Sequence, residues 1–145
     1  MVIIHKAAEG VSGTMLARFL NRGRRELKLG GEVTLLLTSS AQLKRLNSEF
    51  RGKDYATDVL SFPAETEPRR PQQRPAGARA GYAGDIAISV DIARQNGRAM
   101  GYDTATEIKT LTLHGLLHLA GYDHESDHGE MERMERRMRR QLGLR

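Results

Sequence analysis

The chain has 145 residues, a length that fits one compact domain with a buried core. It contains no cysteine, which excludes disulfides, thiolate metal sites and cysteine nucleophiles, so nitrogen and oxygen ligands must hold any metal. A net charge of +5 favours polyanionic partners, nucleic acid foremost, although the same charge also serves simply to keep a protein soluble.

The first third of the chain predicts strands and helices in alternation. Residues 2–5 (VIIH) and 32–38 (EVTLLLT) are rich in the branched residues that suit a pleated sheet. Between them, apolar residues recur at helical spacing and arginines occupy the other face, which predicts a helix. A second helix is predicted at 39–50, where Ser39 and Gln42 stand at capping-box spacing.

The middle of the chain predicts two strands separated by a long basic loop. The segments TDVLSF (57–62) and GDIAIS (84–89) have strand length and clustered apolar residues. Residues 64–82 between them are rich in proline and glycine, which oppose regular structure. The arginines of this loop are Arg69, Arg70, Arg74 and Arg79. We expect the loop to be mobile, either as an insertion without a role or as a basic flap that touches phosphates.

The C-terminal part predicts three helices. Residues 90–100 have a helical pattern, and Thr104 with Glu107 forms a second capping box ahead of the apolar run LTLHGLLHLAG (111–121). A last helix is indicated by an apolar stripe opposite a row of arginines, and such a stripe is typical of packing. Its members are Met131, Met134, Met138 and Leu142. Residues 1–145 therefore predict one α+β domain with a mixed sheet of about four strands packed with about five helices.

The sequence offers no candidate membrane segment. No apolar stretch approaches the roughly 20 residues that cross a bilayer, and the N-terminal apolar run is too short for the core of a signal peptide. We expect a cytoplasmic protein with no membrane association and no disulfide-linked partner.

Three histidines near the C-terminus carry the most specific pattern in the chain. His114 and His118 are four residues apart, so on a helix both imidazoles project from one face and can share a metal. Gly121 can adopt the left-handed backbone that ends a helix and returns His124 toward them. Such a site suits one zinc ion, or another divalent transition metal, with a fourth position open for water. Singly, each histidine would be read as a hydrogen-bonded core residue.

The same spacing is found in the metzincin proteases, whose motif places a glutamate directly after the first histidine as general base. Here that position is Gly115, which cannot accept a proton. A peptidase-like hydrolase remains an alternative only if another residue supplies the base. His5 and His128 have no neighbouring ligand residues in the sequence and stay unassigned.

Three blocks of sequence together are similar to a known family. HGLLHLAGYDH, with NSEFRGKDYATDVLSFP and GDIAIS, resembles the YbeY endoribonuclease family, and the match runs from about residue 32 to the end. The resemblance implies a zincin-like α+β fold and one zinc on His114, His118 and His124. It also implies a single-strand-specific endoribonuclease of ribosomal RNA maturation, chiefly of the small subunit, and of ribosome quality control. The implied partners are single-stranded RNA, ribosomal RNA and the ribosome or its small-subunit proteins.

The resemblance also assigns a functional arginine, which carries over to Arg51, so the expected catalytic residues are Arg51 and His114. A planar guanidinium can bind a phosphate through two donors and stabilise charge that develops as phosphorus is attacked. Lys53 is expected to bind substrate beside Arg51 as a simpler point charge. The chain departs from the family pattern at Ala56, where a proline is common, and in the loop at 64–82.

Four acidic residues in or beside these blocks can orient an imidazole or act as a base, and the sequence does not choose among them. They are Asp58, Asp85, Asp123 and Glu125. A further alternative is a non-catalytic ribosome assembly factor in which zinc only staples the C-terminal helices, although structural zinc sites usually have four protein ligands.

Overall fold

The computed structural model describes residues 1–64, 81–123 and 128–144. Nearly all of the predicted basic loop at 64–82, with its four arginines, and the predicted ligand His124 lie outside the described residues. In the described part the chain forms one four-stranded sheet and five helices, so the predicted α+β class is confirmed.

The sheet is mixed, with the strand order β1-β2-β4-β3. The strands are β1 (Val2–Ile4), β2 (Glu32–Thr38), β3 (Val59–Pro63) and β4 (Tyr82–Ser89). β1, β2 and β4 run parallel to one another, whereas β3 pairs antiparallel with β4 and forms one edge of the sheet. The predicted strands are confirmed within two residues at each end.

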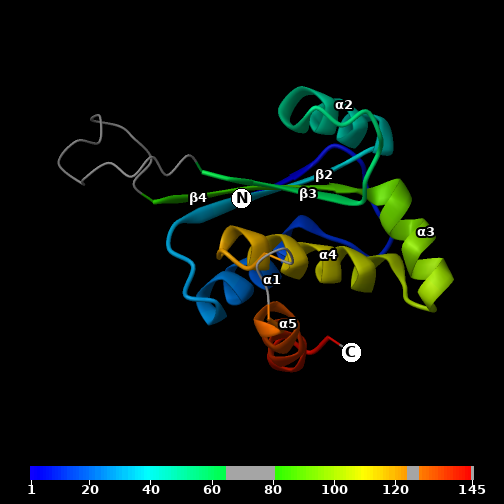
Figure 1. Cartoon of the computed structure of the whole chain (residues 1–145). Coiled ribbons are helices and arrows are strands. Elements are labelled where there is room, and N and C mark those ends of the chain that lie inside the picture. Colours follow the sequence, from blue (N-terminus) through cyan, green and yellow to red (C-terminus); the bar gives the residue numbers. More distant parts are fainter. Residues whose placement is uncertain (65–80, 124–127, 145) are drawn as a thin grey trace.

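Helices cover both faces of the sheet (Figure 1). They are α1 (Gly13–Glu26), α2 (Ser40–Arg51), α3 (Val90–Met100), α4 (Thr104–Leu119) and α5 (Glu130–Gln141). α2 lies on one face, α1 and α4 lie on the other, and α5 packs on the side of α4 that faces away from the sheet (Figure 1). In the described part, no helix is long and apolar enough to span a membrane.

The alternation of β4 side chains divides the core between the two faces. Ile86 and Ile88 are fully buried against α1 and α4, whereas Ala87 between them packs with Leu43 of α2 and Leu60 of β3. Burial of this apolar area on both faces of β4 is the main favourable term that holds the layers together.

α4 is the central helix because it is apolar on nearly every side. It contacts β3, β4, α1, α3 and α5, and Leu113 and Leu117 form the floor of a separate cluster with Met131 and Met138 of α5. The predicted methionine stripe of the last helix is therefore confirmed as packing. The histidine face of α4 is thereby fixed in orientation.

Side chains cap the N-termini of α1, α2, α3 and α4, whereas α5 begins after Gly129 without a side-chain cap. Ser39 accepts a hydrogen bond from the backbone N–H of Gln42, as predicted for α2. The predicted capping box of Thr104 with Glu107 is wrong, because Asp103 is the N-cap residue and accepts from the N–H of Thr106. Glu107 instead points into the protein and is only 4% exposed.

Candidate active site

His114 and His118 lie one turn apart on the half-buried face of α4 and face each other. Their Nε2 atoms are 3.1 Å apart, and the ring planes are nearly perpendicular at 80°. Zinc binds imidazole nitrogen at about 2.0–2.1 Å, so two such ligands of a tetrahedral ion lie roughly 3.3 Å apart. The spacing of the two Nε2 atoms therefore fits two adjacent ligand positions of one zinc ion.

The turn that follows α4 has the form predicted from Gly121. Gly121 adopts a positive φ of 98°, its N–H donates to the carbonyl oxygen of His118, and the N–H of Tyr122 donates to that of Leu117. This pair of bonds closes the turn that ends α4 at Leu119, four residues before Asp123. Among residues 1–64, 81–123 and 128–144, no group of three His, Cys, Asp or Glu residues is placed to hold a metal, and His124 lies outside these ranges.

Packing against the sheet also explains why residue 115 is glycine. A Cβ atom at this position would come within 2.8–3.0 Å of three carbon atoms of Ile86, which is fully buried in β4. α4 can therefore approach the sheet closely only because residue 115 is glycine. A glutamate here, as in the metzincin motif, would have to displace the core.

This contact gives a stability prediction for Gly115→Ala. We expect a loss of about 1–2 kcal/mol, because overpacking of about 1–3 kcal/mol exceeds the gain of just under about 1 kcal/mol in helix propensity. Gly13→Ala is the matched control, since the nearest atom to its added Cβ is Ile4 Cδ1 at 3.8 Å. Urea unfolding of both variants measures the difference, and a Gly115→Ala protein as stable as the parent would contradict the close contact.

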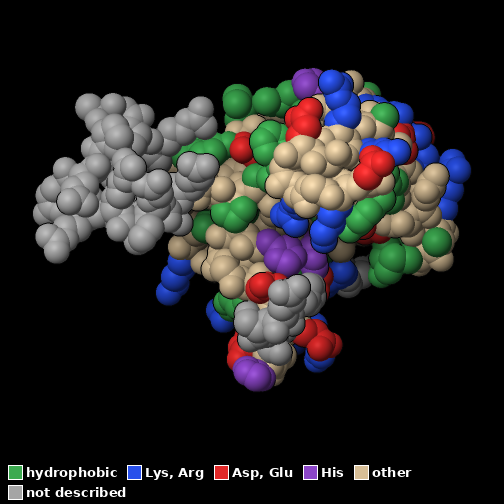
Figure 2. All heavy atoms as spheres, turned by 45° about the horizontal axis from the view of Figure 1, so that its top comes forward, with side chains coloured by type: hydrophobic (Ala, Val, Ile, Leu, Met, Phe, Trp, Pro, Cys, Tyr) green, Lys and Arg blue, Asp and Glu red, His purple; other side chains and the backbone are tan. Residues whose placement is uncertain are grey.

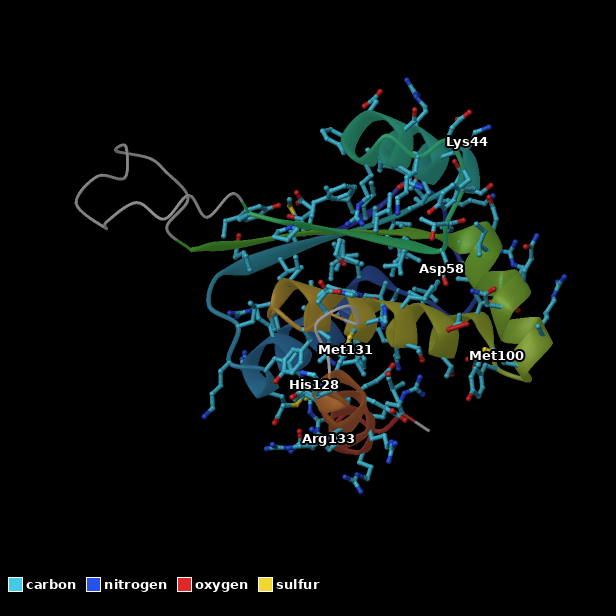
Figure 3. The ribbon with its side chains drawn as sticks, in the orientation of Figure 1. Lys44, Asp58, Met100, His128, Met131 and Arg133 are labelled. Carbon is cyan, nitrogen blue, oxygen red and sulfur yellow. The ribbon has the colours of Figure 1, made fainter. Side chains whose placement is uncertain are left out.

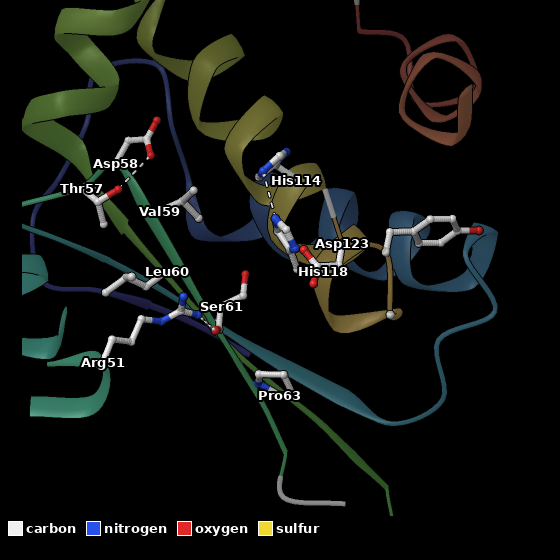
Figure 4. Close-up of a pocket in the computed structure, with 12 residues that line it drawn as sticks. Arg51, Thr57, Asp58, Val59, Leu60, Ser61, Pro63, His114, His118 and Asp123 are labelled. Atoms are coloured by element: carbon white, nitrogen blue, oxygen red, sulfur yellow. Dashed lines mark hydrogen bonds between the residues drawn. The ribbon is translucent and has the colours of Figure 1, made fainter. Parts of the chain in front are cut away.

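A pocket of about 680 Å³ lies between the histidine face of α4 and the edge strand β3 (Figure 4). Its lining residues come from three segments of the chain: Arg51, residues 57–61 with Pro63, and His114 and His118 with residues 121–123. Figure 2 shows histidine side chains at the surface with Lys and Arg side chains beside them. The pocket lining thus combines two imidazoles with one guanidinium, that of Arg51, and two carboxylates, those of Asp58 and Asp123.

Arg51 occupies the wall of the pocket opposite the histidines (Figure 4). It is the last residue of α2, and the left-handed Gly52 turns the chain away directly after it. Its Nη2 donates a hydrogen bond of 2.7 Å to the carbonyl oxygen of Ser61, and its guanidinium lies 5.7 Å from the centroid of the Phe62 ring. A guanidinium has five N–H donors, so an arginine held in this way can also bind a phosphate in the pocket.

Lys53 lies in the exposed turn two residues after Arg51 and is not among the residues that line the pocket. Its backbone N–H donates to the carbonyl oxygen of Asn47, which fixes the turn at the end of α2. Lys53 is therefore an exposed cation close to Arg51 in the chain, and it does not belong to the pocket wall.

The four candidate acids are placed differently. Asp58 and Asp123 line the pocket. Asp85 is two positions from Ala87 and so faces the α2 side of the sheet, where it accepts a hydrogen bond from the Tyr82 hydroxyl. Glu125 lies outside the described residues. Of the three candidate acids that the structure describes, Asp58 and Asp123 are therefore placed to act on a group in the pocket.

Asp58 is held by hydrogen bonds at the start of β3. Its Oδ2 accepts from Asn96 of α3 at 3.2 Å, and its Oδ1 accepts from the Thr57 hydroxyl at 3.4 Å. The Asn96 contact could not be predicted from the sequence, because the two residues are 38 positions apart and meet only through the packing of α3.

Glu107 is the residue of this region that sequence reasoning misassigned. It lies seven positions before His114, at the spacing that places two residues on one face of a helix, and this signal was available in the sequence. Burial, followed by the nearby Asp58 carboxylate, raises the pKa of the Glu107 carboxyl, while Arg139 acts in the opposite direction. The buried carboxyl is therefore kept partly protonated above the ordinary pKa of 4.5.

The raised pKa predicts how stability depends on pH. Between the pKa of Glu107 in the unfolded chain and its raised pKa in the folded protein, the folded protein holds a proton that the unfolded chain releases. The free energy of unfolding therefore falls as pH rises through this interval. We expect metal-free Glu107→Gln to melt a few degrees above the parent protein at neutral pH, with the difference shrinking toward the unfolded pKa. Thermal melts from about pH 5 to 8 measure it, with exposed Glu9→Gln as control. A difference that does not change with pH would contradict the burial of a titrating carboxyl.

Comparison with known proteins gives one consistent result. The family described as Endoribonuclease YbeY matches residues 5–143. The Endoribonuclease YbeY of Koribacter versatilis is 46% identical over 144 residues, which cover 99% of this chain and 86% of that protein. That of Solibacter usitatus is 41% identical over 143 residues, covering 99% and 88%. The solution structure of TM1509 from Thermotoga maritima is 28% identical, with a TM-score of 0.59 over 98% of this chain and 89% of that chain.

Proposed function

We propose, since this chain belongs to the Endoribonuclease YbeY family, that it is a zinc-dependent endoribonuclease that cuts single-stranded RNA. Its role would be in ribosomal RNA maturation, chiefly of the small subunit, and in ribosome quality control in the cytoplasm, with the ribosome or small-subunit proteins as partners. The family resemblance supports these roles. Residues 1–145 would form a single catalytic domain.

The observation that carries the proposal is that a histidine pair and an arginine line opposite walls of one pocket. His114, His118 and His124 would hold the metal, and the 3.1 Å separation of the first two Nε2 atoms fits this role. A bound zinc ion would supply Lewis acidity toward a water molecule or a phosphoryl oxygen. The chain needs no cysteine for such a site.

The residues of the chain supply the remaining requirements of phosphodiester cleavage. Arg51, anchored to the Ser61 carbonyl, would bind the scissile phosphate and stabilise the negative charge that grows on its oxygens in the transition state. Asp58 or Asp123, which share the pocket, would accept the proton of the attacking group. The buried Gly115 offers no base in the place used by metzincin proteases, which favours RNA over peptide as substrate.

The test is a cleavage assay on purified protein combined with metal analysis. We expect about one zinc per chain, fragments from a single-stranded RNA, and far less cleavage of the same RNA in a duplex or of casein. Fragments that end in a cyclic phosphate, with an inert all-deoxy substrate, would identify the ribose 2′-hydroxyl as nucleophile. Casein cleavage without RNA cleavage would instead support the peptidase-like alternative.

A further inference from the structure

Two aromatic side chains are exposed next to the pocket. Phe50, in the last turn of α2, is 66% exposed, and Tyr55, in the loop before β3, is 54% exposed. Phe50 continues the apolar stripe of α2 that includes Leu43 and Leu46, yet those two residues pack into the core while Phe50 extends beyond it. Packing in the core therefore does not account for an aromatic ring at position 50.

Phe50 is joined to the pocket wall through two further contacts. Its ring meets the Phe62 ring edge-on, with the centroids 5.6 Å apart. The same Phe62 ring has the Arg51 guanidinium 5.7 Å from its centroid, and Arg51 lines the pocket. β3 is an edge strand, so the carbonyl oxygen of Ser61 can accept a hydrogen bond from Arg51 at the edge of the sheet. Arg51 thereby connects the pocket on one side of β3 with the Phe50 and Phe62 rings on the other.

The surface around these rings carries more cations than anions. Lys44, Arg45, Arg51 and Lys53 are all exposed, against the exposed acids Glu49 and Asp54. Lys44 is 3.8 Å from Asp54, so part of this charge is compensated locally. Exposed rings beside cations form the combination that binds a single nucleic-acid strand, because bases stack on the rings while cations attract the phosphates.

We propose that Phe50 is a stacking platform for a nucleobase of single-stranded RNA, next to the phosphate that Arg51 binds, with Tyr55 farther along the same surface. This inference rests on the proposed nuclease function and adds to it a path for the strand, from the pocket around the edge of β3 and onto α2. It also supplies a physical reason for a preference for single strands. A base that is paired and stacked within a duplex cannot lie flat against the Phe50 ring.

A fluorescent variant tests the contact directly. The chain contains no tryptophan, so Phe50→Trp places a single reporter on the proposed platform. Met100→Trp is the matched control, because Met100 is 60% exposed at the C-terminal end of α3. Figure 3 shows Met100 well away from α2, on which Lys44 is labelled. Zinc-loaded protein is mixed with a single-stranded RNA oligonucleotide in a stopped-flow instrument, and emission is read before cleavage.

We expect the oligonucleotide to quench Phe50→Trp and to leave Met100→Trp unchanged, while a base-free polyphosphate quenches neither. RNA that binds by anisotropy without quenching Phe50→Trp would overturn the proposal. Equal quenching of both variants would overturn it as well. An emission change of Phe50→Trp with protein concentration, without RNA, would show that a second copy of the chain covers this surface instead.

Kinetics provide the second test and separate this inference from the nuclease itself. Phe50→Ala should raise KM for single-stranded RNA about tenfold, the order expected for one lost stacking contact, and Phe50→Tyr should restore it. We expect kcat to stay near the parent value, because Phe50 lies outside the pocket lining, and the thermal melt to fall only slightly, because the exposed ring loses its edge contact with Phe62. An unchanged KM with intact cleavage would overturn the platform and leave the nuclease standing. Quenching of Phe50→Trp by RNA in a protein that cleaves no RNA would support the stacking platform and contradict the proposed nuclease function.

Discussion

His114→Ala should lose both its bound zinc and its RNA cleavage, whereas His128→Ala should keep both. The Nε2 atom of His114 is 3.1 Å from that of His118, so its removal takes away one of the converging nitrogens of the predicted site. We expect at least about a hundredfold loss of zinc affinity and of cleavage rate, because even residues that only support a metal ligand contribute about ten- to a hundredfold. Zinc titration and the single-stranded RNA assay measure the two quantities.

His128 is a suitable control because it is an exposed histidine near the start of α5 and does not line the pocket (Figure 3). The thermal melt of His114→Ala also decides whether zinc is structural. A variant that loses cleavage but keeps the melt and ribosome association of the parent protein excludes the assembly-factor alternative, in which zinc only staples the C-terminal helices. Full RNase activity in His114→Ala would contradict the assignment of the site.

Local features of this fold could be predicted from the sequence. The strand over residues 32–38, the cap at Ser39 and the left-handed Gly121 depend on a few neighbouring residues, and all three are confirmed. The histidine pair belongs to the same class, because the face of a helix follows from spacing alone. His124 and the basic loop at 64–82 remain predictions.

Features that depend on long-range packing could not be predicted. The insertion of β4 between β2 and β3 brings residues 57–61 opposite α4, and this order builds the pocket. Asp58 and Asp85 looked equivalent in the sequence, but they face different sides of the sheet. Glu107 could be read either as a cap or as a buried residue, and only the choice of Asp103 as N-cap decides between them. Local capping rules are satisfied by either reading.

Arg51→Ala should retain its zinc and its fold but lose cleavage by about a hundred- to a thousandfold in kcat, the loss typical when one group that stabilises transition-state charge is removed. Arg51 is exposed and belongs to no hydrophobic core cluster of the described residues, so we expect only a small fall in the melt, from the lost contacts with Ser61 and Phe62. Retained zinc separates this variant from His114→Ala, since Arg51 stands on the pocket wall away from the histidines. Cleavage within about threefold of the parent rate would contradict a role at the phosphate.

Two further variants show which property of Arg51 matters. Arg51→Lys keeps the charge but loses the planar guanidinium, which can bond Ser61 and a phosphate at the same time. We therefore expect the cleavage rate of Arg51→Lys to recover only partly from that of Arg51→Ala. Lys53→Ala removes a nearby exposed cation that does not line the pocket, and we expect it to change KM by a few fold while kcat is maintained. If Lys53→Ala reduced kcat as strongly as Arg51→Ala, general surface charge rather than the anchored guanidinium would account for catalysis. The bond to Ser61 matters because it fixes the guanidinium before substrate arrives, so less side-chain freedom is lost when a phosphate binds.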